Sequence, residues 1–116
     1  MAFKLSSKTS YKWPVVVHEP KDGGTFSKST FNAQFAYLPQ DEINQVLENA
    51  RLGRDNADLC ERVLQGWGDE VKGEDDQPFA FNEENKAKLL NVPAVRAGVL
   101  AAFIESITGD GARRKN

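Results

Sequence analysis

Residues 29–51 read STFNAQFAYLPQDEINQVLENAR, and the spacing of the apolar residues changes within this stretch. Up to residue 37 every second residue is apolar, which is typical of a strand with one buried face. Beyond Leu38-Pro39 the apolar residues have the spacing of an amphipathic helix and are Ile43, Val46, Leu47 and Ala50. The stretch therefore predicts a strand that leads directly into a helix. Because each element has one apolar side, packing the two together takes both sides out of water.

A second strand is predicted upstream, over residues 11–18, YKWPVVVH. Its apolar positions alternate, and its β-branched and aromatic residues suit a pleated surface. Pro14 cannot donate a ladder hydrogen bond, so we expect it at a strand start or on an open edge. Phe3 and Leu5 indicate a further short strand.

The segment Pro20-Lys21-Asp22-Gly23-Gly24 is a strong turn signal, because its glycines accept positive φ and its Asp bonds its own backbone. It predicts a hairpin between residues 13–19 and 25–37. The second arm begins with the polar residues 25–29, where we expect a bulge or fraying.

Four helices are predicted after the hairpin. They are expected from residue 39 or 40 to 51, from a cap at Asn56 or Asp58 to about 65, from a cap at Asn82 to about 90, and from 93 to about 107. Gly66-Trp67-Gly68 is expected to end the second helix. The acidic residues 69–77 predict a surface loop or a small irregular hairpin.

The predicted fold class is α+β, with an N-terminal antiparallel β-hairpin or small sheet followed by about four helices packed against it. Residues 1–108 are expected to form a single domain, and residues 109–116, GDGARRKN, a mobile polar tail. A chain of 116 residues is long enough to bury a core without metal or disulfide staples.

Charge and composition exclude several classes of protein. Lys and Arg number 15 against 17 Asp and Glu, for a net charge of −2, so no basic field suited to nucleic acid is expected. The chain has one cysteine and no signal-peptide pattern, which favours a reducing cytoplasm. No apolar run is long enough to cross a bilayer, so no membrane partner is expected.

A search for catalytic groups finds no convincing set. His18 is the single histidine, Cys60 lies on an apolar helix face, and no Gly-x-Ser-x-Gly elbow is present. Residues 68–73 have the glycine spacing of a phosphate loop, but Glu74 and Asp75 follow where Lys and Ser or Thr are required. We therefore predict no enzyme activity and no cofactor.

The acidic loop is a candidate metal site, since clustered carboxylates are ligands for Ca²⁺. It lacks the glycine position and the twelfth-place Glu of a calcium loop, so a solvated loop is favoured and no metal is predicted. The candidate partner-binding residues are Trp13, Pro14, Trp67 and Phe79, because aromatic residues dominate binding hot spots. Burial in the core is the alternative for these aromatic side chains, above all for Trp67.

The order of these features resembles the small tail assembly chaperones of long-tailed bacteriophages and prophages. The resemblance covers about residues 11–107 and rests on the following motifs: Trp13-Pro14-Val15, the turn at residues 20–24, Thr30-Phe31 with Phe35, Leu38-Pro39 before Asp41-Glu42-Ile43, Val63-Leu64 before Gly66-Trp67, the acidic loop, Pro78-Phe79, Phe81-Asn82, and Leu89-Leu90 before Pro93-Ala94-Val95. One departure is residues 68–73, where the family pattern leads us to expect two more apolar strands and only Val71 is apolar.

The resemblance implies a non-structural protein made in the bacterial host cytoplasm. Such chaperones are thought to coat the tape measure protein, keep it soluble and deliver it to the tail tube protein. The resemblance also implies self-association along the client, and in many phages a frameshifted longer form. It carries no catalytic residues over to this chain. The surfaces expected to cover a client helix are the Trp13-Pro14 edge and the exposed sides of the first and fourth helices.

Two other classes remain open at this stage. A head-tail connector or tail terminator would share the small size, the acidity and the lack of catalytic groups, but it would stay in the virion. A metal-dependent enzyme or regulator built on the acidic loop is the second alternative, and it would respond to Ca²⁺, Mg²⁺ or Mn²⁺.

Overall fold

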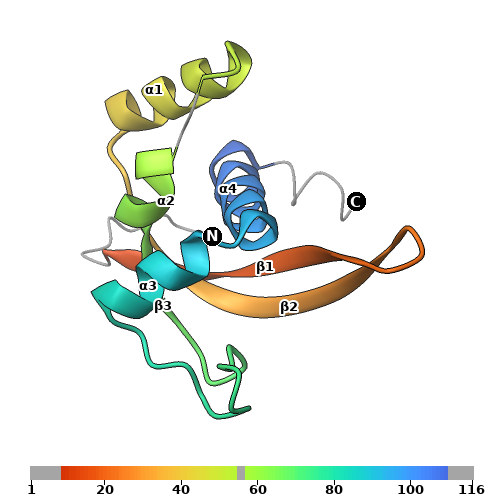
Figure 1. Cartoon of the computed structure of the whole chain (residues 1–116). Helices are drawn as coiled ribbons and strands as arrows, with labels where there is room; N and C mark the ends of the chain where they lie inside the picture. The colour runs from red at the N-terminus through yellow and green to blue at the C-terminus, as the bar shows by residue number, and fades with distance from the viewer. Residues whose placement is uncertain (1–8, 55–56, 110–116) are drawn as a thin grey trace, which may run out of the picture.

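The computed structural model describes residues 9–54 and 57–109. Two long strands, β1 (Ser10–Lys21) and β2 (Thr25–Ala36), form an antiparallel hairpin that extends beyond the helices in Figure 1. Gly23 and Gly24 have φ of 90° and 82° in the turn between them. The predicted hairpin is confirmed. The expected bulge or fraying of residues 25–29 is wrong, because the pairing runs without interruption to Lys21 opposite Thr25.

Both prolines of β1 occupy positions where the ladder needs no donor. The Tyr37 N–H donates to the Thr9 carbonyl oxygen at 3.1 Å, one residue beyond the Ser10–Ala36 pair. Hydrogen-bonded and non-hydrogen-bonded pairs alternate along an antiparallel ladder. Pro14, opposite Asn32, and Pro20 therefore fall at non-hydrogen-bonded positions. Their ring nitrogens face the outer edge of β1, which is an edge strand as expected.

The helix α1 (Gln40–Arg51) follows β2 as predicted, with Asp41 and Glu42 in its first turn. The next helix, α2 (Ala57–Val63), is shorter than expected. Residues expected to finish it and to stop it instead form a third strand, β3 (Leu64–Trp67), antiparallel to β2. The apolar spacing fits a helix locally, but the outer edge of β2 offers backbone partners that an extended segment satisfies. Asp58 lies within the first turn of α2, and Asn56 lies outside the described residues.

The acidic segment forms a small irregular hairpin, as one of the two predicted alternatives. A single bridge joins Lys72 to Pro78, and the Phe79 N–H donates to the Val71 carbonyl oxygen at 2.8 Å. Asn82 then caps α3 (Glu83–Leu90), with its side-chain oxygen accepting the Asn85 N–H at 2.8 Å. This cap is confirmed, as is the start of α4 (Pro93–Thr108) at a proline.

The core lies between one face of the hairpin and the helices α2, α3 and α4. The sheet contributes Val15, Val17, Phe31, Ala33 and Phe35, and the helices contribute Leu59, Cys60, Val63, Leu90, Val95, Val99 and Phe103. The rings of Phe35 and Phe103 meet edge to face with centroids 5.4 Å apart. α1 stands farthest from the sheet in Figure 1, and Val46 is its buried residue.

Two predictions fall outside the described residues: the short strand at Phe3 and Leu5, and most of the polar tail, residues 110–116. Within the described residues no single helix is long and apolar enough to cross a bilayer. α3 and α4 reach that length and composition only together, and a bend of 98° separates them.

Candidate partner-binding site

An aromatic groove lies where the open end of the hairpin meets the helices. Its volume is about 470 Å³. We call it the aromatic groove, and its lining residues are Tyr11, Lys12, Trp13, Tyr37, Leu38, Ile43, Ser106 and Ile107. They come from β1, from the link between β2 and α1, from α1 itself and from the end of α4. The groove therefore unites the three surfaces that the sequence indicated: the Trp13 edge, the first helix and the fourth helix.

Tyr11 holds the walls of this groove together. Its ring contacts Trp13, Phe35 and Tyr37, with centroids 6.5, 6.0 and 4.7 Å away. Its hydroxyl is hydrogen-bonded to the Ser106 Oγ at 2.7 Å, which ties β1 to the last turns of α4. Burial raises the pKa of the Tyr11 hydroxyl, and the Ser106 hydrogen bond partly offsets this. The hydroxyl therefore links β1 to α4 through its hydrogen bond.

The exposed part of the groove is apolar and aromatic. Tyr37 is 56% exposed although it contacts Tyr11. Trp13 is half-buried, and its indole Nε1–H is shielded from solvent with no acceptor among the described residues. Lys12 is the one charged residue in the lining. Such a surface suits apolar side chains from a partner.

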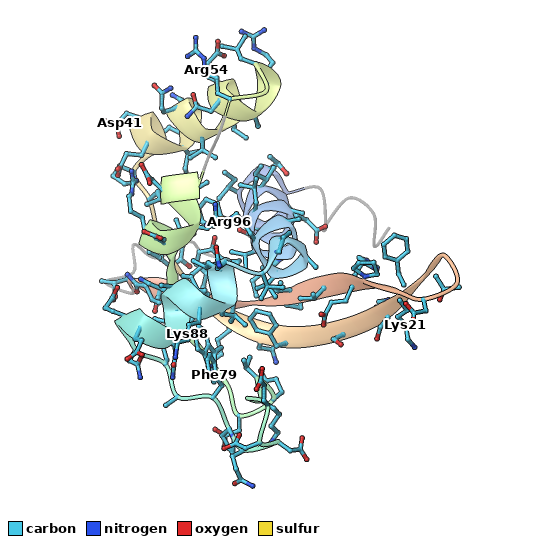
Figure 2. The ribbon with its side chains drawn as sticks, in the orientation of Figure 1. Lys21, Asp41, Arg54, Phe79, Lys88 and Arg96 are labelled. Carbon is cyan, nitrogen blue, oxygen red and sulfur yellow. The ribbon has the colours of Figure 1, made fainter. Side chains whose placement is uncertain are left out.

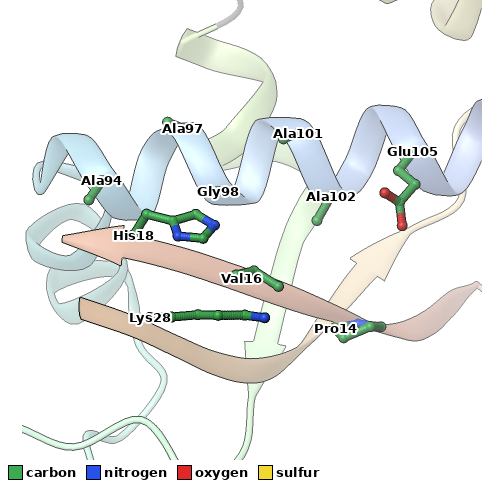
Figure 3. A pocket seen from close by; sticks show the side chains of 10 residues that line it. All are labelled: Pro14, Val16, His18, Lys28, Ala94, Ala97, Gly98, Ala101, Ala102 and Glu105. Carbon is green, nitrogen blue, oxygen red and sulfur yellow. The ribbon is translucent and has the colours of Figure 1, made fainter. Parts of the chain in front are cut away.

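Pro14 does not open on the aromatic groove, although it follows Trp13. Successive strand residues point to opposite faces, so Pro14 lies instead in a second groove between β1 and α4, of about 590 Å³ (Figure 3). His18 lies in the same groove beside Lys28 of β2 and is exposed. Trp13 and Pro14, expected from the sequence to share one surface, therefore line two different grooves.

Trp67 and Phe79 form a third cluster, and Phe79 lies below α3 in Figure 2. Their rings are stacked at 6.1 Å with an interplanar angle of 12°, and the Trp67 Nε1–H donates to the Phe79 carbonyl oxygen. Phe81 meets the Trp67 ring edge to face at 4.8 Å, and the Lys86 Nζ lies 5.8 Å from the Phe81 centroid. The stacked rings and the hydrogen bond from Trp67 to Phe79 hold the acidic hairpin against β3. Phe81, 37% exposed, is the open apolar part of this cluster.

Cys60 and the acidic residues do not form a reactive site among the described residues. Cys60 is 1% exposed, with its Sγ 4.0 Å from the Arg96 carbonyl oxygen, so it packs as a small buried thiol. Across residues 9–54 and 57–109, no three His, Cys, Asp or Glu side chains converge where they could hold a metal ion.

Glu70 has a role that the sequence did not indicate. Its Oε1 accepts the Asn32 N–H at 2.9 Å, at the point where β3 has ended and β2 continues. This hydrogen bond is the main reason that the pKa of Glu70 is lowered. Gly68 leaves the necessary space, since a Cβ there would lie 2.5 Å from the Glu70 Oε2. The Gly68-x-Glu70 spacing is the one local signal, and it is weak.

Comparison of the chain with protein-family models, with curated proteins and with solved structures finds no match.

Proposed function

We propose that this protein is a tail assembly chaperone of a long-tailed phage or prophage, and that it binds the tape measure protein in the bacterial host cytoplasm. The observation that carries the proposal is the aromatic groove, which gathers β1, α1 and α4 around half-buried Trp13 and exposed Tyr37. The resemblance in the order of sequence motifs supports it independently.

In this proposal the groove covers part of the apolar stripe of a tape measure helix. Helix-in-groove recognition uses apolar side chains spaced three or four residues apart, and a groove of this volume accepts a few of them. Each contact is weak, so it remains displaceable when tail tube protein polymerises. Many copies on one long client give the assembly its avidity. No catalytic residue and no cofactor takes part.

Co-expression with the tape measure gene of the same genome tests the proposal. We expect soluble tape measure protein that co-purifies with several copies of this chain. Insoluble client beside monomeric protein would refute the role. Recovery of the protein in purified virions would instead favour the head-tail connector or tail terminator.

A matched pair of variants locates the binding surface. Tyr37→Asp places a charge in the aromatic groove, whereas Leu52→Asp places one at the end of α1, where Leu52 is 44% exposed. Both sites are exposed, so both variants are expected to fold. We expect Tyr37→Asp to weaken client binding about tenfold or more and Leu52→Asp to leave it unchanged. Equal effects would place the client elsewhere.

A further inference from the structure

The outer edge of β2 is paired over only part of its length. Within the described residues, β3 pairs with β2 only from Ala33 to Phe35. Glu70 takes the Asn32 N–H at the next outward position. The same alternation that directs the backbone of Pro14 away from β2 directs the backbone N–H and C=O groups of Phe26, Lys28 and Thr30 away from β1. We call residues 25–31 the open β2 edge.

The opposite edge of the sheet is closed to strand pairing. Pro14 and Pro20 remove two of its outward N–H donors. α4 packs so closely on β1 between them that a Cβ at Gly98 would lie 2.5 Å from the Val16 carbonyl oxygen. Figure 3 shows α4 running along β1 in this region.

The open β2 edge has none of these protections. It contains no proline, and its register with β1 is regular from Thr25 to Asn32. Phe26 is 66% exposed, more than the other large apolar residues of the described chain. Lys28 is its one charged residue. An edge with free backbone donors and acceptors, and with no proline or covering helix, is a template for another strand.

We propose that the open β2 edge pairs with the same edge of a second copy, antiparallel about a two-fold axis at Ser27. In this register Phe26 of each copy lies directly opposite Lys28 of the other, with both side chains on the same side of the sheet. An aromatic ring beside a lysine is a favourable cross-strand pair, with a cation-π contribution. The pairing covers Phe26 and adds about four backbone hydrogen bonds.

The neighbouring registers are disfavoured by observations on this chain. A two-fold axis at Lys28 opposes two like charges. An axis at Ser29 pairs Lys28 with Thr30 and cannot extend to Asn32, because Glu70 already accepts the Asn32 N–H. The Ser27 register uses free outward groups and places a favourable side-chain pair at both of its hydrogen-bonded positions.

This inference deepens the proposed function, because it names the surface through which copies associate along a client. The aromatic groove lies at the Tyr11 end of the hairpin and the open β2 edge near its turn, about 25–30 Å away along the strands. A dimer therefore leaves both grooves open. About seven residues per copy is far less than a stable interface uses, so we expect a dissociation constant on the order of 100 µM.

Cysteine crosslinking of the purified chain alone tests the register. Ser27→Cys places two thiols at a non-hydrogen-bonded pair with Cα atoms about 4.5 Å apart, within disulfide range. Ser29→Cys places them about 13 Å apart. Cys60 is buried and serves as an internal background. We expect Ser27→Cys to form covalent dimers at least tenfold faster than Ser29→Cys. Equal rates, or faster Ser29→Cys, would overturn the register.

Sedimentation equilibrium with two proline variants tests the edge itself. His18 and Lys28 face each other across the hairpin at a non-hydrogen-bonded pair, so a proline at either position spares the ladder. We expect Lys28→Pro to abolish the dimer and His18→Pro to retain it. A monomeric wild type at millimolar concentration, or a dimer that survives Lys28→Pro, would refute the proposal. The sedimentation experiment contains no client, so its failure does not test the proposed function. If a monomeric chain still keeps the tape measure protein soluble on co-expression, the dimer is refuted and the proposed function is retained.

Discussion

Gly98→Ala tests how closely α4 packs on β1. In an ordinary helix this change is stabilising by about 1 kcal/mol, because glycine loses more backbone entropy on folding than alanine. Here the new Cβ would lie 2.5 Å from the Val16 carbonyl oxygen and 3.3 Å from the Val15 Cγ1. The closest contact is with backbone of a paired strand, so α4 itself must move away.

The two effects have opposite signs, and the structure indicates which is larger. Overpacking a well-packed contact costs about 1–3 kcal/mol. After the helix-propensity gain, we expect a net loss of about 1 kcal/mol in the free energy of unfolding, or a fall of about 4 °C in Tm.

Thermal and urea unfolding followed by circular dichroism measure this change. Ala101→Gly, at an exposed position of the same helix, calibrates the propensity term and is expected to cost about 1 kcal/mol. If Gly98→Ala raises Tm while Ala101→Gly lowers it, α4 does not approach β1 as described and the reasoning is wrong.

Two further predictions concern single hydrogen bonds. Because the pKa of Glu70 is lowered from its ordinary 4.5, its carboxylate stabilises the fold above that pH, and this contribution is lost as the pH falls through the folded pKa. Glu70→Gln is therefore expected to make the urea midpoint fall less steeply below about pH 5. An unchanged pH dependence would contradict the Asn32 hydrogen bond. Asn82→Ala removes the cap of α3 and is expected to lower the free energy of unfolding by about 1 kcal/mol. Asn82→Asp keeps an acceptor for the Asn85 N–H and is expected to retain most of the stability. Equal losses for the two variants in urea unfolding would argue against the cap.

Elements with strong local signals were predicted well. The hairpin follows from alternation on both sides of a glycine turn, and α1 from the change of period after Leu38-Pro39. α3 and α4 follow from an asparagine cap and a proline start. The errors occur where distant segments compete. Residues Leu64–Trp67 fit the end of a helix by spacing, yet they pair with β2 as β3.

The candidate site was predicted only in part. Trp13 and the two helices that flank it were identified, but Tyr37 and the Tyr11–Ser106 hydrogen bond were not, because they depend on how the end of α4 reaches the hairpin. Trp13 and Pro14 were grouped by adjacency, whereas alternation along β1 separates them into two grooves. Trp67 and Phe79 were each selected as candidate partner-binding residues, and this role stays a prediction; the structure stacks their rings on each other.

The sequence alone determines the hairpin, its turn and the starts of α1, α3 and α4, since periodicity, glycine, proline and capping residues act within a few residues along the chain. Only the tertiary structure decides which strand edge is closed and which is open. α4 and two outward prolines close β1, while β3 and Glu70 cover β2 only as far as Asn32. These outcomes depend on backbone groups from distant segments that must find partners once the core is packed, and no local pattern records which partner each will take.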